Sequence, residues 1–433
     1  MKKRTRKLAS ILTAAAMLTS LSAAVWADPA QIGSNGTVTS AETSVYIAKS
    51  INVTNPLDTT VYSPSTTYTY SITPATVAAN STVTDADGHT GKVVAGVNGG
   101  AVLDATTLTL NSTAVTANQD TDEVTGNIKV NIDLSVFTEP GIYRYKITDE
   151  TTDAILHNSG LERSAEYDTV RYLDVYIKRD ATSGDLVVLG YALFNGKVLD
   201  VDGNGETEVS VATNTAKSTG YVSGSEPGTG TDNLSLTDIY RTYNVTITKQ
   251  VTGEMGNKTH PFPFTIAVNS NGTNSHYFAG LSGSTAANPV ATNSISTQLT
   301  HGQTFQIIGL SPLDTVNATE TNDTYDTYTV SVDNADGNIV PGTPRSNGQT
   351  LAVADTPFQV STYDTTAGTH GTSASVPNDT LTFTNNLAAI SPTGVIIRSL
   401  PYVAMVVIAG AMLVAIKMLN KSEKKGENKN EAN

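Results

Sequence analysis

The chain has 433 residues, and its 40 acidic against 26 basic side chains give a net charge of −14. This acidity argues against nucleic acid or an anionic membrane surface as partner. Cysteine is absent, so disulfides cannot stabilise the protein. The six histidines show no metal-ligand spacing, and neither a phosphate-binding glycine loop nor a catalytic triad is recognisable. We therefore expect no cofactor and no enzymatic turnover.

The first 27 residues have the pattern of an export signal. MKKRTRK is a basic n-region, residues 8–21 form an apolar h-region, and Val25-Trp26-Ala27 is a small-x-small cleavage site. We expect the mature protein to begin at Asp28 and to be secreted.

Between the signal and residue 389, short segments rich in Thr, Val and Tyr alternate apolar with polar residues. In chain order they include SVYIAKSINV, TYTYSI, IKVNIDLSVF, GIYRYKITDE, RYLDVYIK, LVVLGYALF, YNVTITKQV, FPFTIAV, TFQIIGL and LTFTNNL. Alternation with a period of two, interrupted by Gly, Asn, Asp and Pro clusters, predicts an all-β sandwich fold. Residues 79–122 and 200–233 look inserted or loop-like.

The two halves of the mature chain repeat one pattern. SVYIAKSINV corresponds to YNVTITKQVTG, YRYKITDE to VNATETND, and LSLTDIY to LTFTNNL. The repetition predicts two tandem domains of one type, residues 28–239 and 240–389.

The last segment, residues 390–433, joins a short motif to an apolar run and a basic tail. ISPTG at residues 390–394 is followed by residues 395–419, long enough to cross a membrane as a helix, and lysines follow on the cytoplasmic side. This order resembles the sorting signal of sortase substrates, which implies cleavage between Thr393 and Gly394. Pro392 directly precedes Thr393, whereas the familiar signal is Leu-Pro-x-Thr-Gly, and this spacing resembles the variant motifs of some pilin-specific sortases. A plain membrane anchor is the alternative.

A wider resemblance covers most of the mature chain. YNVTITKQVTG, HPFPFTIAV, HGQTFQIIGLSPLDTVNATE, LTFTNNL and PTG are similar to the C-terminal domain of backbone pilins of Gram-positive bacteria. FTEPGIYRYKITDE, EYDTVRYLDVYIK and VVLGYALFNGK are similar to the N-terminal domain of the same pilins. The resemblance implies tandem Ig-like (CnaB-type) domains, each closed by a self-made isopeptide bond between a Lys and an Asn or Asp.

In the second domain the resemblance implies that Lys249 is the nucleophile, Asn385 the amide attacked and Glu320 the assisting acid. A lysine on the first strand and an asparagine on the last can lie side by side in a sandwich. An apolar interior favours a neutral amine and a neutral acid, the states needed for attack and for proton donation. Asn386 is a neighbouring candidate, but it should face the opposite side of its strand. The alternative is that each is an ordinary surface residue.

In the first domain the resemblance assigns the nucleophile to Lys49 and its partner to Asp238, where the relatives often have Asn. A Lys–Asp bond would release water in place of ammonia. The assisting acid aligns with Asp149, and Glu150 is the fallback. An unreacted buried ion pair between Lys49 and Asp238 is the alternative.

Polymerisation requires an amine of the next subunit to attack the sortase-bound carbonyl of Thr393. In the resembled pilins this lysine lies in the N-terminal domain. Lys197 in GYALFNGK aligns best, and Lys217 in TAKSTG is the alternative. Either residue could instead be an ordinary loop lysine.

The segment DVDGNGETE is the nearest approach to a metal site. It places Asp200, Asp202, Asn204 and Glu208 at calcium-loop positions 1, 3, 5 and 9. Position 12, which should carry a bidentate Glu, is Val211. We therefore expect no metal site.

Together these patterns predict a structural backbone subunit of a covalent pilus on a Gram-positive cell wall, transiently anchored in the membrane before sorting. Its expected partners are other copies of the chain, a sortase and peptidoglycan. Tip or accessory pilins and host ligands are further candidates. A monomeric wall-anchored adhesin built from the same domains is the alternative. A secreted enzyme would need a reactive constellation elsewhere in the sequence, and we find none.

Overall fold

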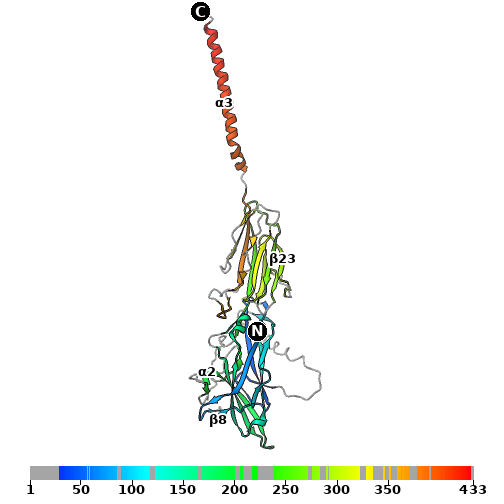
Figure 1. Cartoon of the computed structure of the whole chain (residues 1–433). Helices are drawn as coiled ribbons and strands as arrows, with labels where there is room; N and C mark the ends of the chain where they lie inside the picture. The colour runs from blue at the N-terminus through cyan, green and yellow to red at the C-terminus, as the bar shows by residue number, and fades with distance from the viewer. Residues whose placement is uncertain are drawn as a thin grey trace, which may run out of the picture. The chain divides into compact units, whose positions relative to one another are not determined.

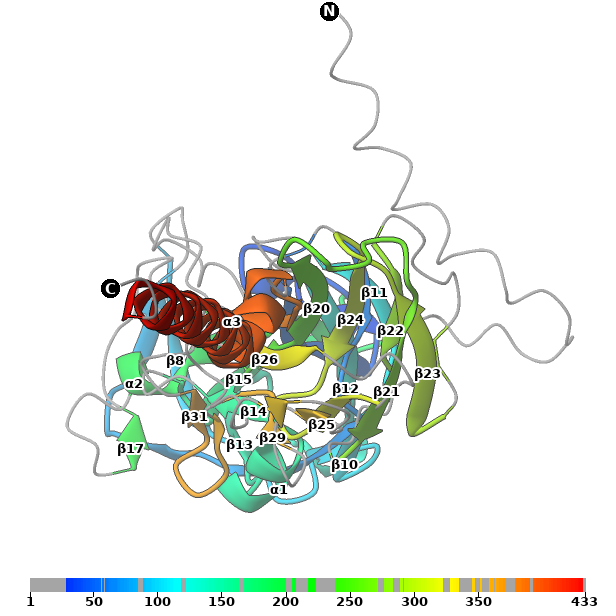
Figure 2. The same cartoon turned by 90° about the horizontal axis from the view of Figure 1, so that it is seen from above.

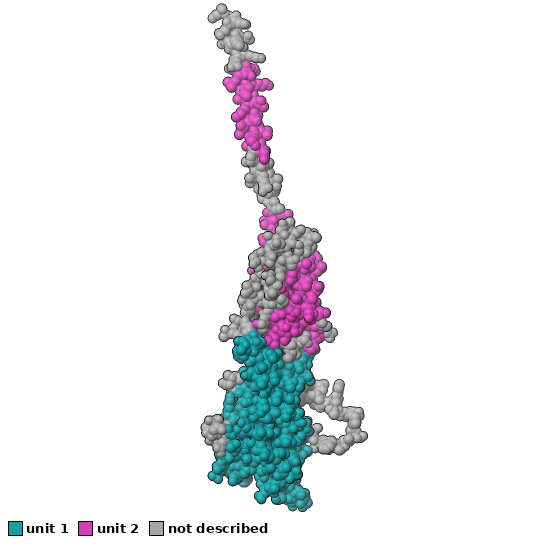
Figure 3. Space-filling model, in the orientation of Figure 1, with its two compact units in different colours: residues 1–242, 272–275, 362–374 teal, residues 243–271, 276–361, 375–433 magenta. Residues whose placement is uncertain are grey.

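The structure is a computed structural model that describes residues 29–55, 57, 59–84, 89–117, 122–163, 167–199, 205–207, 217–222, 238–271, 276–282, 289–290, 292–321, 328–334, 345–346, 351–352, 358–361, 363–370, 378–389 and 392–430. Its fold is all-β, as the alternating pattern predicts, and the strands form two compact units (Figure 1). Unit 1 comprises residues 1–242, 272–275 and 362–374, and unit 2 comprises residues 243–271, 276–361 and 375–433 (Figure 3).

Unit 1 is built on two large sheets. In the described residues the first sheet has the order β14-β19-β3-β12-β9, and β1 and β18 also pair with β3. Its strands are β1 (Ala30–Gln31), β3 (Ser44–Thr54), β9 (Ala101–Leu103), β12 (Asp122–Ile132), β14 (Leu161–Arg163), β18 (Gly220–Tyr221) and β19 (Asp238–Arg241). The central strand β3 pairs antiparallel with β12 but parallel with β19, the last strand in chain order of the two large sheets.

The second sheet of unit 1 has the order β10-β5-β13-β15-β16-β2, with β8 alongside β13 and β7 alongside β8. Its strands are β2 (Thr37–Val38), β5 (Thr66–Pro74), β7 (Thr82–Thr84), β8 (Thr90–Ala95), β10 (Thr107–Leu110), β13 (Gly141–Asp149), β15 (Val170–Arg179) and β16 (Leu186–Asn195). Residues 79–122, which look inserted or loop-like in the sequence, thus contribute β7 to β11 to the sheets. Their Thr-rich segments are too short for the alternation to identify.

Smaller elements complete unit 1. They are the strand pairs β4 (Thr59–Tyr62) with β11 (Ala114–Ala117), β6 (Thr76–Val77) with β17 (Glu206–Thr207), and β30 (Tyr363–Asp364) with β31 (Thr369–His370), and the short helices η1 (Leu134–Val136), α1 (Asp153–Asn158) and α2 (Gly196–Leu199). The β30–β31 hairpin comes from the later half of the sequence, and Tyr363 donates a hydrogen bond to the Leu161 carbonyl at 2.6 Å.

The alternation of β3 decides what its two faces contact. Val45, Ile47, Ile51 and Val53 are buried in the core, and Lys49 occupies the same inward-facing series. Apolar side chains of the second sheet pack on the opposite side of this core. The alternation of side chains along β3 therefore places Lys49 in the hydrophobic interior.

The second sheet is also buried on its outer face. There Arg144 and Asp174 lie opposite each other on β13 and β15 and form two hydrogen bonds, Nε to Oδ1 at 2.7 Å and Nη2 to Oδ2 at 2.8 Å. Both side chains are fully buried, and the Phe194 ring lies 5.4 Å from the guanidinium carbon. A second small core of Ala75, Tyr172, Ala192, Phe194 and Leu199 covers this face.

Unit 2 is a sandwich of two sheets with described orders β22-β24-β20-β32-β26-β27 and β23-β21-β25-β28, with β29 also on β25 (Figure 2). The strands are β20 (Tyr243–Thr252), β21 (Phe262–Asn269), β22 (Phe278–Leu281), β23 (Ser294–Leu299), β24 (Thr304–Leu310), β25 (Thr315–Glu320), β26 (Thr329–Asn334), β27 (Arg345–Ser346), β28 (Leu351–Ala352), β29 (Phe358–Gln359) and β32 (Asn378–Asn386). The first strand, β20, pairs parallel with the last, β32. Inward-facing residues of both sheets form one core.

A helix, α3 (Pro392–Asn430), follows β32, the last strand of unit 2 (Figure 1). Its segment Tyr402–Lys421 is long and apolar enough to cross a membrane, with a mean hydropathy of 2.3, and none of it is buried in the protein. An exposed apolar helix of this length fits the expected membrane segment at residues 395–419.

We expect the buried Arg144–Asp174 pair on the outer face of the second sheet to contribute to the stability of unit 1. Arg144→Met should lower the free energy of unfolding by about 3 to 5 kcal/mol, because Asp174 is left charged and buried without a partner. Urea denaturation of the mature chain measures the change. Adding Asp174→Leu should recover most of the loss, and the exposed change Lys178→Met should stay within about 0.5 kcal/mol. Equal losses in all three variants would contradict this role of the pair.

Candidate functional site

In unit 2 the strand period points one lysine and one asparagine into the same core. On β20, Lys249 belongs to the buried series of Val245, Ile247 and Val251, and it is 0% exposed. On β32, Asn385 belongs to the buried series that includes Leu381 and Phe383, whereas Asn386 is exposed, as expected for the next residue on a strand. Asn385 lies opposite Val251, two residues beyond Lys249, in the parallel ladder.

Glu320 contacts both of these side chains from the facing sheet. It ends β25, where alternation buries Val316, Ala318 and Glu320. Lys249 Nζ donates a hydrogen bond to Glu320 Oε2 at 2.8 Å, and Asn385 Nδ2 donates to Glu320 Oε1 at 2.6 Å. Lys249, Glu320 and Asn385, the residues that the sequence singles out in the second domain, therefore lie together as a buried triad.

Aromatic rings surround the triad and exclude water. Lys249 Nζ lies 4.2 Å from the centre of the Phe262 ring and 6.0 Å from that of Phe264, which packs edge-on against Phe383. Desolvation lowers the pKa of Lys249 from 10.5 to about 8, although the neighbouring charge and hydrogen bond of Glu320 oppose this shift. The amine is thus much easier to deprotonate than a surface lysine.

The amide of Asn385 has one unused acceptor. Its Oδ1 is buried and accepts no hydrogen bond within the described structure. A half-turn of the amide about the Cβ–Cγ bond would place Oδ1 against Glu320, where a protonated carboxyl group can donate to it. The same contact would then stabilise negative charge that develops on this oxygen during attack at Cγ.

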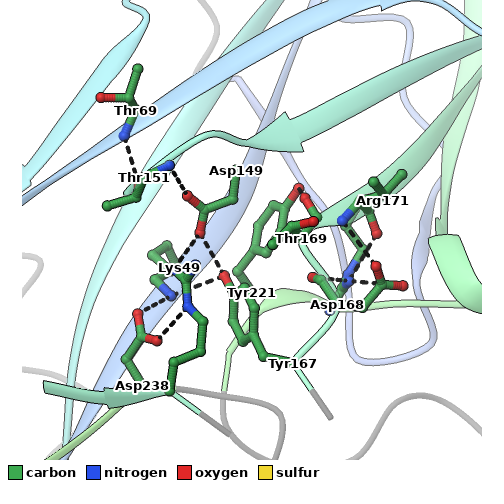
Figure 4. A network of polar contacts seen from close by, with 12 residues as sticks. Lys49, Thr69, Asp149, Thr151, Tyr167, Asp168, Thr169, Arg171, Tyr221 and Asp238 are labelled. Carbon is green, nitrogen blue, oxygen red and sulfur yellow. Dashed lines mark hydrogen bonds and ion pairs between the residues drawn. The ribbon is translucent and has the colours of Figure 1, made fainter. Parts of the chain in front are cut away.

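Unit 1 contains a corresponding cluster around Lys49 (Figure 4). Lys49 Nζ donates to Asp238 Oδ2 at 2.7 Å and to the Tyr167 hydroxyl at 3.1 Å. The side chains of Lys49 and Asp238 are fully buried. Asp238 lies opposite Ile51, two residues beyond Lys49, in the parallel pairing of β3 with β19.

The two clusters have matching positions in their sheets. In both units the partner residue faces the position two beyond the lysine, Ile51 or Val251. In both units the acid ends a strand of the other sheet and is paired with an aromatic residue, Asp149 with Tyr70 and Glu320 with Phe264. Each lysine also lies over the aromatic ring two residues before the one paired with the acid. Lys49 Nζ is 4.4 Å from the centre of the Tyr68 ring, and Lys249 lies over Phe262.

The acid of unit 1 contacts the cluster differently. Asp149 Oδ2 accepts hydrogen bonds from Tyr167 at 2.8 Å and from Arg163 Nη2 at 3.0 Å, and Oδ1 accepts one from the Thr151 amide at 3.0 Å. Arg163 Nε also donates to Asp238 Oδ1 at 3.1 Å. Glu150, the fallback acid, is exposed and accepts a hydrogen bond from Ser71 at 2.5 Å, away from Lys49.

Charges in unit 1 are strongly coupled. Desolvation raises the pKa of Asp238, but the positive charges of Lys49 and Arg163 outweigh it, so this pKa lies below its ordinary value. Desolvation is the largest effect on Lys49 and lowers its pKa, against the pull of Asp238 and Asp149. Burial raises the pKa of Tyr167 well above 10.0, so its hydroxyl keeps a proton. Arg163 is thus the permanent cation of the cluster.

Arg163 and Tyr167 are members of the cluster that the sequence interpretation missed. Arg163 ends the three-residue strand β14, which is too short for its alternation to be recognised, and Tyr167 lies before β15. The usable signal was their chemistry: an arginine and a tyrosine shortly after a buried strand that ends in Asp149 are common partners of a buried carboxylate.

The other predicted site residues lie outside these clusters. Lys197 is exposed on α2, and its backbone amide donates a hydrogen bond to Asp168 Oδ2 at 2.8 Å. Lys217 is half-buried, and its backbone forms an isolated antiparallel β-bridge with Phe194. Thr393 and Gly394 lie in the first turn of α3, and their side-chain surroundings are outside the description. The calcium candidates Asp200, Asp202, Asn204 and Glu208 also lie outside the described residues. Within the described ranges, no group of three or more His, Cys, Asp or Glu could hold a metal ion.

Comparisons with known proteins return one family model and several solved structures. The model of a domain of unknown function, DUF7601, matches residues 243–349, a range that includes Lys249 and Glu320 but not Asn385. The major pilin of Streptococcus pyogenes is similar at 16% identity, over 79% of this chain and 99% of that chain, with a TM-score of 0.42. A second major pilin of this species has 17% identity over 81% and 99%, with a TM-score of 0.41.

A pilus-presented adhesin is also similar, at 18% identity over 50% of this chain and 37% of that chain, with a TM-score of 0.24. No curated protein sequence matches the chain.

The lowered pKa of Lys249 predicts a pH dependence of stability in a variant that cannot crosslink, Asn385→Ala. Folded Lys249 loses its proton near pH 8, whereas the unfolded chain keeps it to about 10.5, so the unfolded state binds more protons between these values. The free energy of unfolding should therefore rise by up to roughly 3 kcal/mol from pH 8 to 10.5. Denaturant titrations across this range measure it.

The matched control is the double variant Asn385→Ala, Lys249→Met, which should lack the rise. If both variants follow the same pH profile, Lys249 does not have a lowered pKa in the folded unit.

Proposed function

We propose that this protein is the structural backbone subunit of a covalently polymerised cell-surface pilus, with one intramolecular isopeptide bond in each of its two domains. The observation that carries the proposal is the repeated geometry: a buried lysine on the first long strand, an Asn or Asp at the same ladder offset on the last strand of the two main sheets, and a buried acid on the facing sheet. Two independent burials of lysine in one chain are costly unless the lysines react or pair.

In the second domain the proposed reaction joins Lys249 to Asn385. The lysine proton passes to Glu320 over the 2.8 Å contact, which leaves a neutral amine and a neutral acid. The amine attacks Cγ of Asn385, Glu320 donates its proton to the developing oxyanion, and collapse breaks the Cγ–Nδ2 bond. One lysine proton stays on the new amide, and two leave with the departing NH2 group as an ammonium ion, so Glu320 ends as a carboxylate and the neutral mass of the chain falls by one ammonia.

In the first domain the same geometry supports a bond between Lys49 and Asp238, with loss of one water. The reactants are held in contact at 2.7 Å within a buried site, which corresponds to a high effective concentration. Each domain reacts once with itself, so the chemistry is a maturation step and not enzymatic turnover.

Assembly into a fibre is the second part of the proposal. A sortase cuts between Thr393 and Gly394 while the apolar segment of α3 holds the exported chain in the membrane. The Thr393 carbonyl is then transferred to a lysine of the next subunit. Lys197 is the leading candidate because it is exposed, and half-buried Lys217 is the alternative. The last subunit is joined to peptidoglycan.

The crosslinks explain how an exported chain without cysteine gains stability. They would close chain segments of 189 residues in unit 1 and 136 residues (385 − 249) in unit 2. By the loop-entropy estimate used for disulfides, each lowers the entropy of the unfolded chain enough to stabilise its domain by roughly 5 kcal/mol.

The mass of the mature chain tests the crosslinks. We expect it to be lower than the encoded mass by one ammonia and one water, because each bond expels one small molecule. Glu320→Ala should retain the ammonia, and Asp238→Ala should retain the water while leaving the ammonia loss intact. Intact-mass spectrometry distinguishes these species, and an unaltered chain at its full encoded mass would refute both bonds.

Fibre assembly has its own test in cell-wall extracts. The unaltered chain should give a ladder of bands that withstands SDS, because its subunits are covalently joined. Thr393→Ala should abolish the ladder, and Lys197→Arg should abolish it if Lys197 is the acceptor. A single band from the unaltered chain would favour the monomeric adhesin, and a ladder that survives Lys197→Arg would move the joint to Lys217 or another lysine.

A further inference from the structure

The acids of the two clusters are placed at different distances from the reacting groups. In unit 2, Glu320 contacts both Lys249 and Asn385 directly. In unit 1, the hydrogen bonds of Asp149 within the described structure come from Thr151, Arg163 and Tyr167, and neither Lys49 nor Asp238 is among them. An Asp side chain is one methylene shorter than Glu, so it stops short of the lysine.

Tyr167 fills the space between Lys49 and Asp149. Its hydroxyl oxygen accepts a hydrogen bond from Lys49 Nζ at 3.1 Å, and its proton is donated to Asp149 Oδ2 at 2.8 Å (Figure 4). A hydroxyl is both donor and acceptor, so it can receive one proton while it gives up another. This continuous path begins at the nucleophile and ends at the acid.

Arg163 fixes the other end of the path. It donates to Asp149 Oδ2 at 3.0 Å and to Asp238 Oδ1 at 3.1 Å, and its guanidinium carbon lies 4.2 Å from the centre of the Tyr167 ring. All three groups that contact Asp149 donate hydrogen to it, so Asp149 is the acceptor at this end of the path. Unlike Lys49, arginine keeps its own proton in proteins.

We propose that Tyr167 is a catalytic residue of the first domain, relaying a proton from Lys49 to Asp149, while Arg163 holds both carboxylates and offsets the charge on Asp238 during attack. The inference rests on the proposed Lys49–Asp238 bond and assigns its proton path. The second domain needs no relay, because Glu320 contacts Lys249 itself.

The reaction balances with the groups present. The Lys49 ammonium gives one proton to the Tyr167 oxygen as the Tyr167 proton moves to Asp149. The neutral nitrogen attacks Cγ of Asp238, and the electron pair of the carbonyl moves onto Oδ1, beside Arg163. The Cγ–Oδ2 bond then breaks, and Oδ2 leaves as water with one proton from the attacking nitrogen and one returned from Asp149 through Tyr167.

The charges of the cluster support this assignment. Before the reaction, Lys49 and Arg163 face the carboxylates of Asp149 and Asp238. The bond removes the charges of Lys49 and Asp238 together, and Arg163 and Asp149 remain as a hydrogen-bonded pair. No uncompensated charge is left in the core at the end, which avoids the large cost of an unpaired buried ion.

The test compares two tyrosines of the same cluster by changing each to phenylalanine in the full chain. Tyr167→Phe removes the relaying hydroxyl but keeps the ring that contacts Lys49 and Arg163. Tyr70→Phe removes a buried hydroxyl that has no hydrogen-bond partner in the described structure, so it is the matched control. Chains are labelled during a short pulse of synthesis, sampled over time and digested. Mass spectrometry then gives the fraction of Lys49 peptide linked to Asp238 peptide.

In Tyr167→Phe the Lys49–Asp238 link should form roughly 100-fold more slowly, a typical contribution of a positioned proton-transfer group. The Lys249–Asn385 link in the same samples should form at its normal rate and shows that the chain folds. Tyr70→Phe should match the unaltered chain in both links.

The possible outcomes separate the two proposals. A normal rate in Tyr167→Phe, or equal slowing in Tyr70→Phe, overturns the relay and leaves the proposed bond in place. If the unaltered chain never links Lys49 to Asp238, both the first-domain bond and the relay are wrong. Loss of both links in Tyr167→Phe would mean a folding defect, and Asp149→Asn then decides: a normal rate there overturns the relay, and slowing of the first link alone supports it.

Discussion

The structure of each unit depends on one constraint, the burial of a lysine on its first long strand beside the last strand of its two main sheets. A buried lysine must lose its charge, pair with an acid or react. Around Lys49 and Lys249 lie aromatic rings that exclude water and an acid on the facing sheet. The side-chain carbonyl carbon of Asp238 or Asn385 lies on the neighbouring strand, so each of the three outcomes has a partner group nearby. The parallel pairing of β3 with β19 and of β20 with β32 brings these groups together, although they are far apart in sequence.

The same pairing has a mechanical consequence. In unit 2 the chain enters near β20 and leaves through β32 toward α3, so tension along a fibre would act on these neighbouring strands. Without a covalent joint, the load would fall on the hydrogen bonds of the β20–β32 ladder. The proposed bond between Lys249 and Asn385 would pass the tension from one strand directly to the other. A chain without cysteine would thereby gain the mechanical benefit that secreted proteins often take from disulfides.

Much of this arrangement could be predicted from sequence because it follows from strand period and repetition. Alternation in YNVTITKQV and LTFTNNL puts Lys249 and Asn385 among inward-facing apolar residues and turns Asn386 outward. The correspondence of LSLTDIY with LTFTNNL placed Asp238 at the same offset as Asn385. Alternation does not identify very short strands, and it does not predict contacts of the residues between strands. Arg163 on the three-residue strand β14 and Tyr167 before β15 therefore escaped notice, as did the assignment of the β30–β31 hairpin to unit 1.

Single-molecule force spectroscopy of the mature chain, held at its two ends, tests the central claim most directly. If Lys249 and Asn385 are joined, stretching unit 2 should release no length from the segment between them at any force that leaves covalent bonds intact. If they are not joined, unfolding of unit 2 should release that segment of 136 residues (385 − 249), about 450 Å of extended chain. An event of this length in the unaltered chain would contradict the account.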